Sequence, residues 1–257
     1  MTTVRHMGYM ALRDLRALWR QPWYVVATLV QPVIWLLLFG ELFKRVADLP
    51  GFGHESYIAY LAPGVVIMSA LFSSGWNGMA TIEDINRGVT DRLLVSPVSR
   101  AALIAGRVAQ SAVVIVIQSA IMVGIALAAG ASFPGGVVGV LVLILASALL
   151  GACFAALSNS LALVTRQEES LIGAVTLLVL PLTFLSTALM TSALLPSWMH
   201  TVADFNPVDW AIEAGREAVQ GSPDWGNVAG YCGLLLAFAL ACTMLATRAF
   251  RAYQAQV

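Results

Sequence analysis

Residues 137–164 read VVGVLVLILASALLGACFAALSNSLALV, residues 165–170 read TRQEES, and residues 171–190 read LIGAVTLLVLPLTFLSTALM. Each apolar stretch has at least the roughly 20 residues that a helix needs to cross the hydrocarbon core of a bilayer. Burying Arg166 at the centre of a membrane helix would cost about 2.5–3.5 kcal/mol on insertion scales. The chain is therefore expected to leave the membrane at Thr165–Ser170, and this part of the sequence predicts two spans joined by a polar turn.

The same pattern occurs four more times along the chain. Apolar stretches without a charge near the middle run over Trp23–Phe43, Tyr57–Met79, Val108–Leu127 and Val228–Ala246. Hydrophobic residues make up 59% of the 257 residues and charged residues 11%, against roughly 25% charged residues in soluble domains. The sequence therefore predicts an all-α membrane protein with six transmembrane helices in a single domain, residues 1–257.

The basic residues indicate how these helices are oriented. If the N-terminus is cytoplasmic, the inner segments contain all but three of the 14 lysines and arginines, and only Lys44, Arg45 and Arg216 lie outside. Cytoplasmic loops of membrane proteins carry an excess of such residues. Both termini are therefore predicted to be cytoplasmic.

Residues 1–22 have a pattern typical of a helix that lies in the membrane interface. At helical spacing, Arg13 and Arg16 share one side of residues 8–20, and leucine, alanine and tryptophan side chains share another. Such a helix would place its arginines at anionic lipid headgroups. The same arginines could also act as a simple positively charged anchor, and the two roles are compatible.

The external segment 191–227 is predicted to form two short, re-entrant-like helices before the last span. Asn206 would cap the second helix, with Pro207 at its first position. Glu213 and Arg216 lie one turn apart on its polar face and can form an ion pair. Its other face is apolar and tryptophans are nearby, so this helix is expected to sit at the outer interface or dip into it.

The polar cytoplasmic segment 81–100 is longer than a passive connection requires. Thr81 would cap a short helix, and Gly88 would end it. Acidic residues in the first turn would be stabilised by the helix dipole. Glu83 and Asp84 would form the acidic side of this helix, and Ile82 and Ile85 would form its apolar ridge.

The residue types that are missing exclude several classes of function. Lys44 is the only lysine and no Gly-x-x-x-x-Gly-Lys-Ser/Thr sequence surrounds it, so the chain is not expected to bind ATP through a Walker motif. Neither a metal site, a nucleic-acid partner nor an intramembrane enzyme is predicted. The predicted spans also lack the titratable residues that ion-coupled carriers use. The sequence favours the membrane part of a machine driven by a separate subunit, with a scaffold or a self-sufficient carrier as the alternative.

The order of these features resembles the ABC-2 type permease family, the membrane subunits of ATP-driven exporters, over nearly the whole chain. Its motifs are matched by Glu83…Gly88…Arg92-Leu93…Pro97…Arg100 and by Leu195-Pro196…Asn206-Pro207…Arg216…Gly221. The family pattern has Gly-Thr in the first motif, whereas Val89 here stands between Gly88 and Thr90. The subgroup that the chain resembles most is the antibiotic-resistance type typified by daunorubicin exporters.

The resemblance implies a cytoplasmic partner. In this family the segment between spans two and three is a coupling helix that rests in a groove of an ABC ATPase subunit, and the N-terminal helix touches the same subunit. Two ATPase copies, which bind ATP and magnesium, would drive two permease chains that are identical or related. The contacts with the ATPase are assigned to Ile82, Glu83, Asp84, Ile85, Arg87, Gly88, Asp91, Arg92, Arg13 and Arg16.

The resemblance also implies a route for the substrate. The family places it between the two permease chains along spans one, two and five, which here contain Pro32, Pro63 and Pro181. The implied function is export of hydrophobic or amphipathic small molecules, such as antibiotics, across a bacterial cytoplasmic (inner) membrane. A lipid-linked polysaccharide or glycolipid is the alternative cargo. Candidate lining residues, each of which could instead face lipid or the core, are Gln31, Trp35, Phe39, Phe72 and Phe184.

Overall fold

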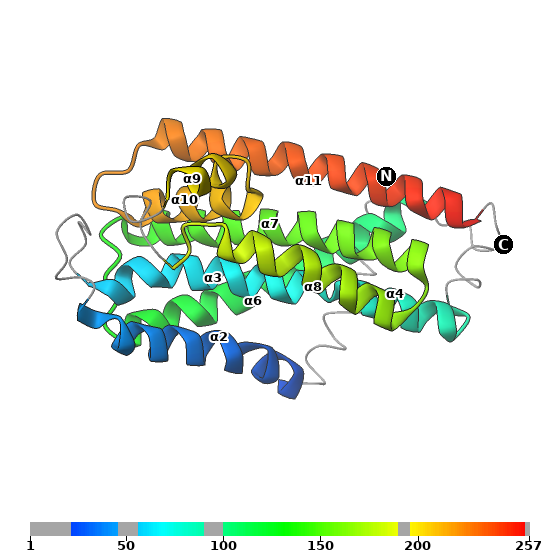
Figure 1. The fold of residues 1–257 in the computed structure, drawn as a ribbon, viewed down its shortest axis with the longest axis horizontal. Helices are drawn as coiled ribbons and strands as arrows, with labels where there is room; N and C mark the ends of the chain where they lie inside the picture. The colour runs from blue at the N-terminus through cyan, green and yellow to red at the C-terminus, as the bar shows by residue number, and fades with distance from the viewer. Residues whose placement is uncertain (1–21, 46–55, 90–99, 190–195, 255–257) are drawn as a thin grey trace.

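The computed structural model describes residues 22–45, 56–89, 100–189 and 196–254, which form helices and turns without a strand among them (Figure 1). The all-α prediction is confirmed for this part of the chain. The helices are α2 (Pro22–Leu42), α3 (Tyr57–Gly75), α4 (Asn77–Asn86), α6 (Arg100–Ala128), α7 (Gly136–Thr165), α8 (Glu168–Phe184), α9 (Ser197–Ala203), α10 (Pro207–Val219) and α11 (Trp225–Gln254).

The long helices lie along the long axis of the molecule, with α9 and α10 at one end and α4 at the other (Figure 1). We refer to these as the α10 end and the α4 end. Helix α7 is central, because it packs against α3, α4, α6, α8, α10 and α11. A Cβ atom on Gly139 of α7 would overlap the carbonyl oxygen of Ala218 in α10. Small residues at such contacts let membrane helices approach closely.

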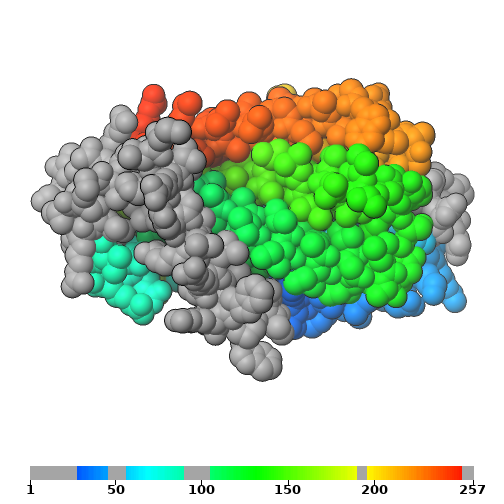
Figure 2. Space-filling view, turned by 180° about the vertical axis from the view of Figure 1, so that it is seen from behind, coloured from blue at the N-terminus to red at the C-terminus, as the bar shows by residue number. Residues whose placement is uncertain are grey.

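Several helices have the length and composition of membrane spans. Among the described residues, Tyr57–Asn86, Ala105–Ala128, Gly136–Thr165 and Trp225–Phe250 are long and apolar enough to cross a membrane, and Thr28–Leu42 of α2 is a shorter apolar helix. Large apolar side chains remain exposed on the outside of the bundle. From behind, α6 and α7 (green) form the surface between α11 (orange) and α2 (blue) (Figure 2). Such apolar surfaces are unfavourable in water and suit contact with lipid.

Helix α8 is shorter than the fifth span predicted over Leu171–Met190. It ends at Phe184, and the next five residues are not helical. The side-chain amide of Asn206 donates hydrogen bonds to the carbonyl oxygens of Leu182 and Leu185, at 2.8 and 2.9 Å. Carbonyl groups at a helix end need such partners. The prediction of one continuous helix is therefore wrong beyond Phe184, because a residue distant in sequence satisfies the end of α8.

Helix α4 begins earlier than predicted. Thr81 was expected to cap the helix of the cytoplasmic segment, but α4 starts at Asn77, directly after a break at Trp76 that ends α3. Thr81 therefore lies inside the helix, and the prediction of a cap is wrong. Gly88 follows the end of α4 with a φ of 67°, a left-handed conformation that favours glycine, so its predicted role as a stop is confirmed.

Candidate substrate cavity and its connections

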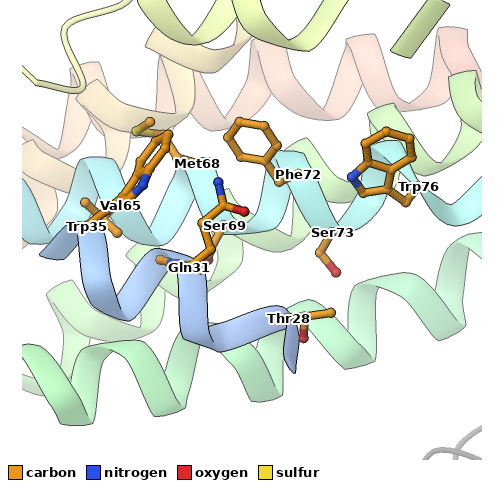
Figure 3. Close-up of a pocket in the computed structure, with 10 residues that line it drawn as sticks. Thr28, Gln31, Trp35, Val65, Met68, Ser69, Phe72, Ser73 and Trp76 are labelled. Carbon is orange, nitrogen blue, oxygen red and sulfur yellow. The ribbon is translucent and has the colours of Figure 1, made fainter. Parts of the chain in front are cut away.

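A cavity of about 190 Å³ lies between α2 and α3 (Figure 3). Each helix contributes residues that follow one another at helical spacing, so one face of each helix forms the wall. The last lining residue in sequence, Trp76, lies at the break between α3 and α4. The lining residues are Thr28, Gln31, Pro32, Trp35, Val65, Met68, Ser69, Phe72, Ser73 and Trp76.

The wall of the cavity is aromatic and uncharged. Trp35 and Phe72 pack edge to face, with 6.2 Å between ring centroids and an angle of 86°. Gln31 contributes its amide group to the same wall (Figure 3). None of the lining residues carries a charge. Apolar cavities with a few polar groups are typical sites for small apolar or amphipathic molecules, although whole drug-sized ligands usually occupy roughly 300–1,000 Å³.

The structure brings together most of the residues that were predicted to line a substrate route. Gln31, Trp35 and Phe72 line the cavity, and the ring of Phe39 lies 6.0 Å from that of Trp35. Phe184 does not line it and is 58% exposed. The reason is the helix arrangement, since α2 packs mainly on α3 and α6, whereas α8 packs on α3, α4 and α7. The prediction for Phe184 is not supported for this cavity.

A buried glutamine of α6 supports the cavity from behind. Gln118 is 2% exposed, and its Nε2 donates a hydrogen bond of 2.9 Å to the hydroxyl oxygen of Thr28. Its Oε1 has no hydrogen-bond partner among the described residues. A buried unpaired polar atom costs about 1–3 kcal/mol of stability. In the sequence, Gln118 is only a polar residue within the third apolar stretch, and nothing places it beside Thr28.

Five polar side chains at the α4 end tie α4 to its neighbours. Arg107 of α6 donates hydrogen bonds to Asp84 at 2.5 Å and to Thr81 at 2.7 Å. Thr81 also hydrogen-bonds Asn159 of α7, whose amide nitrogen donates to Asn77 at 2.9 Å. We refer to these five residues as the α4 clasp. It connects α4 to both α6 and α7.

The break between α3 and α4 is held by α7 as well. The Ser158 hydroxyl donates to the carbonyl oxygen of Gly75 and accepts a hydrogen bond of 2.9 Å from the backbone N–H of Gly78. These backbone groups flank Trp76, which lines the cavity. The cavity wall and the α4 clasp are therefore parts of one connected element.

Helix α4 exposes fewer of the predicted ATPase-contacting residues than expected. Glu83 and Arg87 are exposed and form an ion pair with each other at 2.5 Å. Ile82 is 1% exposed and belongs to the core of the bundle, and Ile85 packs partly against that core. Ile82 therefore cannot fill a groove in a partner, and its prediction is wrong because the apolar ridge faces the bundle. Also among the predicted contacts, Arg13, Arg16, Asp91 and Arg92 lie outside the described residues.

The predictions from sequence did not include Arg107, Ser158 or Asn159. A signal for the last two is present, because Ser158, Asn159 and Ser160 are three consecutive polar residues in an otherwise apolar stretch. Polar groups in a membrane span need partners and often have a function. The sequence does not show that the partners are in α3, α4 and α6.

Helix α10 is inserted into the end of the bundle. Asn206 caps it by accepting the Val208 N–H at 2.9 Å, and Glu213 pairs with Arg216 at 2.9 Å, so both predicted interactions are confirmed. The apolar face is covered by α7 and α11. The polar face is partly buried, since Asp209 and Arg216 are each 7% exposed, whereas the side chain of Glu213 is 33% exposed. The predicted interfacial helix is thus packed into the described bundle over most of its surface.

Comparison with known proteins identifies the family to which these features belong. The family model described as ABC-2 type transporter matches residues 5–219. The chain belongs to the ABC-2 type transporter family. The resemblance inferred from the motifs at Glu83–Arg100 and Leu195–Gly221 is therefore confirmed, and the protein is a multi-pass membrane protein.

Similar proteins of this family include permeases connected with drug resistance. The daunorubicin resistance ABC transporter permease protein DrrB1 of Streptomyces coeruleorubidus is 28% identical over 84% of this chain and 75% of its own length. The probable doxorubicin resistance ABC transporter permease protein DrrC of Mycobacterium tuberculosis is 26% identical over 77% and 71%. The inner membrane transport permease YadH of Escherichia coli is 28% identical over 92% and 93%. These names agree with a permease subunit of an ABC transporter.

Proposed function

We propose that this permease is the membrane subunit of an ATP-driven exporter, and that its cargo binds first in the cavity between α2 and α3. The cargo would be a hydrophobic or amphipathic small molecule. The observation that carries this proposal is the uncharged cavity wall that contains the Trp35–Phe72 ring pair and the amide of Gln31. Relatives named for daunorubicin and doxorubicin resistance support the same class of cargo.

The proposed arrangement in the membrane uses six spans, formed by α2, α3, α6, α7, α8 and α11. Both termini and α4 would be cytoplasmic, in a bacterial cytoplasmic membrane, and the α10 end would face outside. The basic residues support this orientation, because Arg87 and Arg166 directly follow α4 and α7, and Arg107 and Arg248 lie toward the ends of α6 and α11 that are on the same side of the bundle as α4 (Figure 1).

A reporter protein fused after Val257 is expected to be active only as a cytoplasmic protein. In the same cells, Ser222→Cys is expected to react with a membrane-impermeant thiol reagent added from outside, because Ser222 is exposed in the turn between α10 and α11. Activity of the fused reporter on the external side, or protection of Cys at position 222, would contradict the six-span topology.

The proposed partners are two copies of a cytoplasmic ABC ATPase, which bind ATP and magnesium, and a second permease chain, identical or related. Glu83 of α4 and Arg87, which directly follows α4, are exposed and would contact the ATPase, and residues 1–22 would touch the same subunit. A cavity of about 190 Å³ holds only part of a drug-sized molecule. The second permease chain would supply the remaining wall.

The connected element from the cavity to α4 suggests how ATP would drive transport. ATP binding would draw the two ATPases together and move α4, and rigid helices transmit such movements. Because the α4 clasp ties α4 to α6 and α7, and Ser158 holds the break at Trp76, the movement would reach the cavity wall at Trp76 and Phe72. The wall would then change shape as the ATPases close.

The test is purification of the tagged permease from its host in a mild detergent, followed by ATPase assays of the complex with added drug. A soluble Walker-motif protein should accompany it in equal amount, and an aromatic drug should stimulate ATP hydrolysis. Trp35→Ala and Phe72→Ala are each expected to raise the half-stimulating concentration about tenfold, which corresponds to about 1.4 kcal/mol of lost binding. The measurement is the drug dose-response of ATP hydrolysis.

Leu177→Ala is the matched control, because Leu177 is a large apolar residue on α8 that is 77% exposed and outside the cavity. Its dose-response should equal that of the unchanged protein. A permease that purifies alone and transports in an uncoupler-sensitive way would instead be a self-sufficient carrier. Stimulation by a lipid-linked glycan and not by small aromatic drugs would assign the alternative cargo.

A further inference from the structure

The cavity between α2 and α3 is lined by different kinds of side chain at its two ends. Helix α3 runs toward α4, so Val65 lines the part of the cavity that is farther from α4, and Ser73 and Trp76 line the part nearest to it. In the close-up, Trp35 lies on the side of Val65, and Thr28 lies on the side of Trp76 (Figure 3). The wall is therefore apolar and aromatic at one end and carries hydrogen-bonding groups at the other.

The polar groups of Ser73 and Trp76 are not used by the fold itself. Within the described residues, neither the Ser73 hydroxyl nor the Trp76 indole N–H has a hydrogen-bond partner. Ser69 and Ser74 of the same helix instead donate to backbone carbonyl oxygens one turn earlier, at 2.7 and 3.0 Å. Serines inside helices commonly bond back to their own backbone in this way. The Ser73 hydroxyl lines a cavity without such a bond and is free to bind a ligand.

The wall near α4 is also polar behind its surface. Thr28 lines the cavity, and its hydroxyl accepts a hydrogen bond of 2.9 Å from Gln118 of α6. Gln118 is 2% exposed, and its Oε1 has no partner among the described residues. Burying polar groups in this way is unfavourable by itself. It makes this end of the wall better suited to a polar group than to an apolar one.

The polar end of the cavity suits an uncharged group better than a cation. Among the described residues, no carboxylate lines the cavity, and an ammonium group buried without a counter-ion is strongly unfavourable. Aromatic faces can bind cations. Here, however, the planes of Trp35 and Phe72 are 86° apart, with 6.2 Å between ring centroids. The two rings pack against each other and do not enclose a cation between their faces.

We propose that Ser73 and Trp76 form a hydrogen-bonding subsite that selects cargo with an uncharged hydroxyl or carbonyl group at one end of an apolar body. This inference rests on the proposed function, because it concerns the cargo of the same cavity. The two residues are three positions apart and so share one side of the chain at helical spacing. The indole N–H donates to the oxygen of the cargo, and the serine hydroxyl donates to it or accepts from it. The apolar body lies against Trp35.

The direction of this polarity matches that of an amphiphile in the inner leaflet. In the proposed topology α4 is cytoplasmic, so Ser73 and Trp76 lie nearer the inner headgroups, and Trp35 lies nearer the middle of the bilayer. An amphiphile in the inner leaflet also holds its polar group toward the cytoplasm and its apolar body toward the hydrocarbon. It therefore enters the cavity from that leaflet without reversing its direction.

The test measures binding of three probes to the full-length permease in lipid nanodiscs. The probes are hydroxymethylanthracene, methylanthracene and trimethylammoniomethylanthracene, all substituted at the same ring position. Equilibrium dialysis against nanodiscs with and without permease separates binding to the protein from partitioning into lipid. The unchanged permease should bind the hydroxymethyl probe most tightly, because only its group both donates and accepts hydrogen bonds.

Two variants remove the groups of the subsite one at a time. Ser73→Ala should weaken binding of the hydroxymethyl probe about fivefold, the usual effect of one hydrogen bond, and leave that of methylanthracene unchanged. Trp76→Phe keeps an aromatic ring without the N–H and should cause the same selective loss. Ser74→Ala is the matched control, because it removes the same atom at the next position of α3, where the hydroxyl is bonded within the helix. It should change neither affinity.

Trp35→Ala separates this inference from the proposed function, since it should weaken binding of the hydroxymethyl and methyl probes alike. If it does so while Ser73→Ala and Trp76→Phe have no selective effect, the cavity binds cargo and the hydrogen-bonding subsite is wrong. Tightest binding of the ammonium probe would overturn the uncharged class of cargo. If Trp35→Ala changes neither affinity, or neither probe binds, the proposed function fails and the subsite fails with it.

Discussion

Replacing Arg216 by alanine is expected to lower the free energy of unfolding by about 3–5 kcal/mol, the usual cost of leaving a buried charge without its partner. Its guanidinium pairs with Glu213 at 2.9 Å and donates to the Thr187 carbonyl oxygen at 3.0 Å. It also lies over the ring of Tyr60, 3.9 Å from the centroid. Removal would leave the partly buried Glu213 carboxylate and the Thr187 carbonyl without this donor. Unfolding by a denaturing detergent, in one lipid environment for all variants, measures the loss.

Arg216→Lys is the matched control for this prediction. Lysine keeps the positive charge but cannot reproduce the planar fork that contacts Glu213 and Thr187 together, so we expect a smaller loss than with alanine. If Arg216→Ala unfolded like the unchanged protein, the contacts of Arg216 with Glu213, Thr187 and Tyr60 would not hold α10 in the bundle. An equal loss in both variants would show that geometry, and not charge, is what these contacts require.

Replacing Arg107 by alanine is expected to reduce export at least tenfold while the ATPase of the complex continues to hydrolyse ATP. Arg107 joins α6 to α4 through Asp84 and Thr81, so its loss frees α4 from one side of the α4 clasp. Movement of α4 would then no longer be passed to the cavity wall. The free energy of unfolding should fall by about 1–3 kcal/mol, because partly buried polar groups lose their partner. Export and ATP hydrolysis are measured together in proteoliposomes containing the partner ATPase.

Arg87→Ala is the control for stability, because Arg87 and Glu83 form an exposed pair on the same helix. Exposed pairs at this spacing contribute about 0.3–0.5 kcal/mol, so the melting temperature should change little. Arg107→Lys, which keeps one of the two contacts, should retain part of the export activity. Unchanged export in Arg107→Ala would show that the clasp does not transmit movement.

The two ends of the bundle have different roles in the proposed transport mechanism. At the α4 end, polar contacts bind α4 to α6 and α7 beside the break that lines the cavity. At the α10 end, the last turn of α8 accepts a hydrogen bond from Asn206, and the non-helical segment after it accepts one from Arg216. The cavity between α2 and α3 lies between these two anchored ends. A change in helix packing between the ends would therefore alter the shape of the cavity.

Much of the fold could be predicted because local composition determines it. The apolar stretches on both sides of Thr165–Ser170 became α7 and α8, since Arg166 is too costly to bury in lipid and so ends the first of them. Gly88 ended α4, and Asn206 with Pro207 began α10, because caps and stops depend on a few neighbouring residues. Three of five predicted path residues line one cavity because helical spacing places them on facing sides.

The features that could not be predicted all depend on partners far apart in the sequence. Ile82 was placed on an exposed ridge, but periodicity cannot say which side the bundle will cover, and α4 turns that residue into the core. Arg107 and Asn159 can hydrogen-bond to residues of α4 only because the fold places α6 and α7 beside α4.

Helix α8 shows most clearly which features depend on the local sequence and which depend on tertiary contacts. The sequence by itself determined that a second apolar helix follows the break at Arg166, because burial of apolar side chains in lipid is a local property of that stretch. Only the tertiary structure decided that it ends at Phe184, because the hydrogen bonds that allow this come from Asn206. Likewise the sequence determined the ion pair of Glu213 and Arg216, and packing against α3 buried the arginine of that pair.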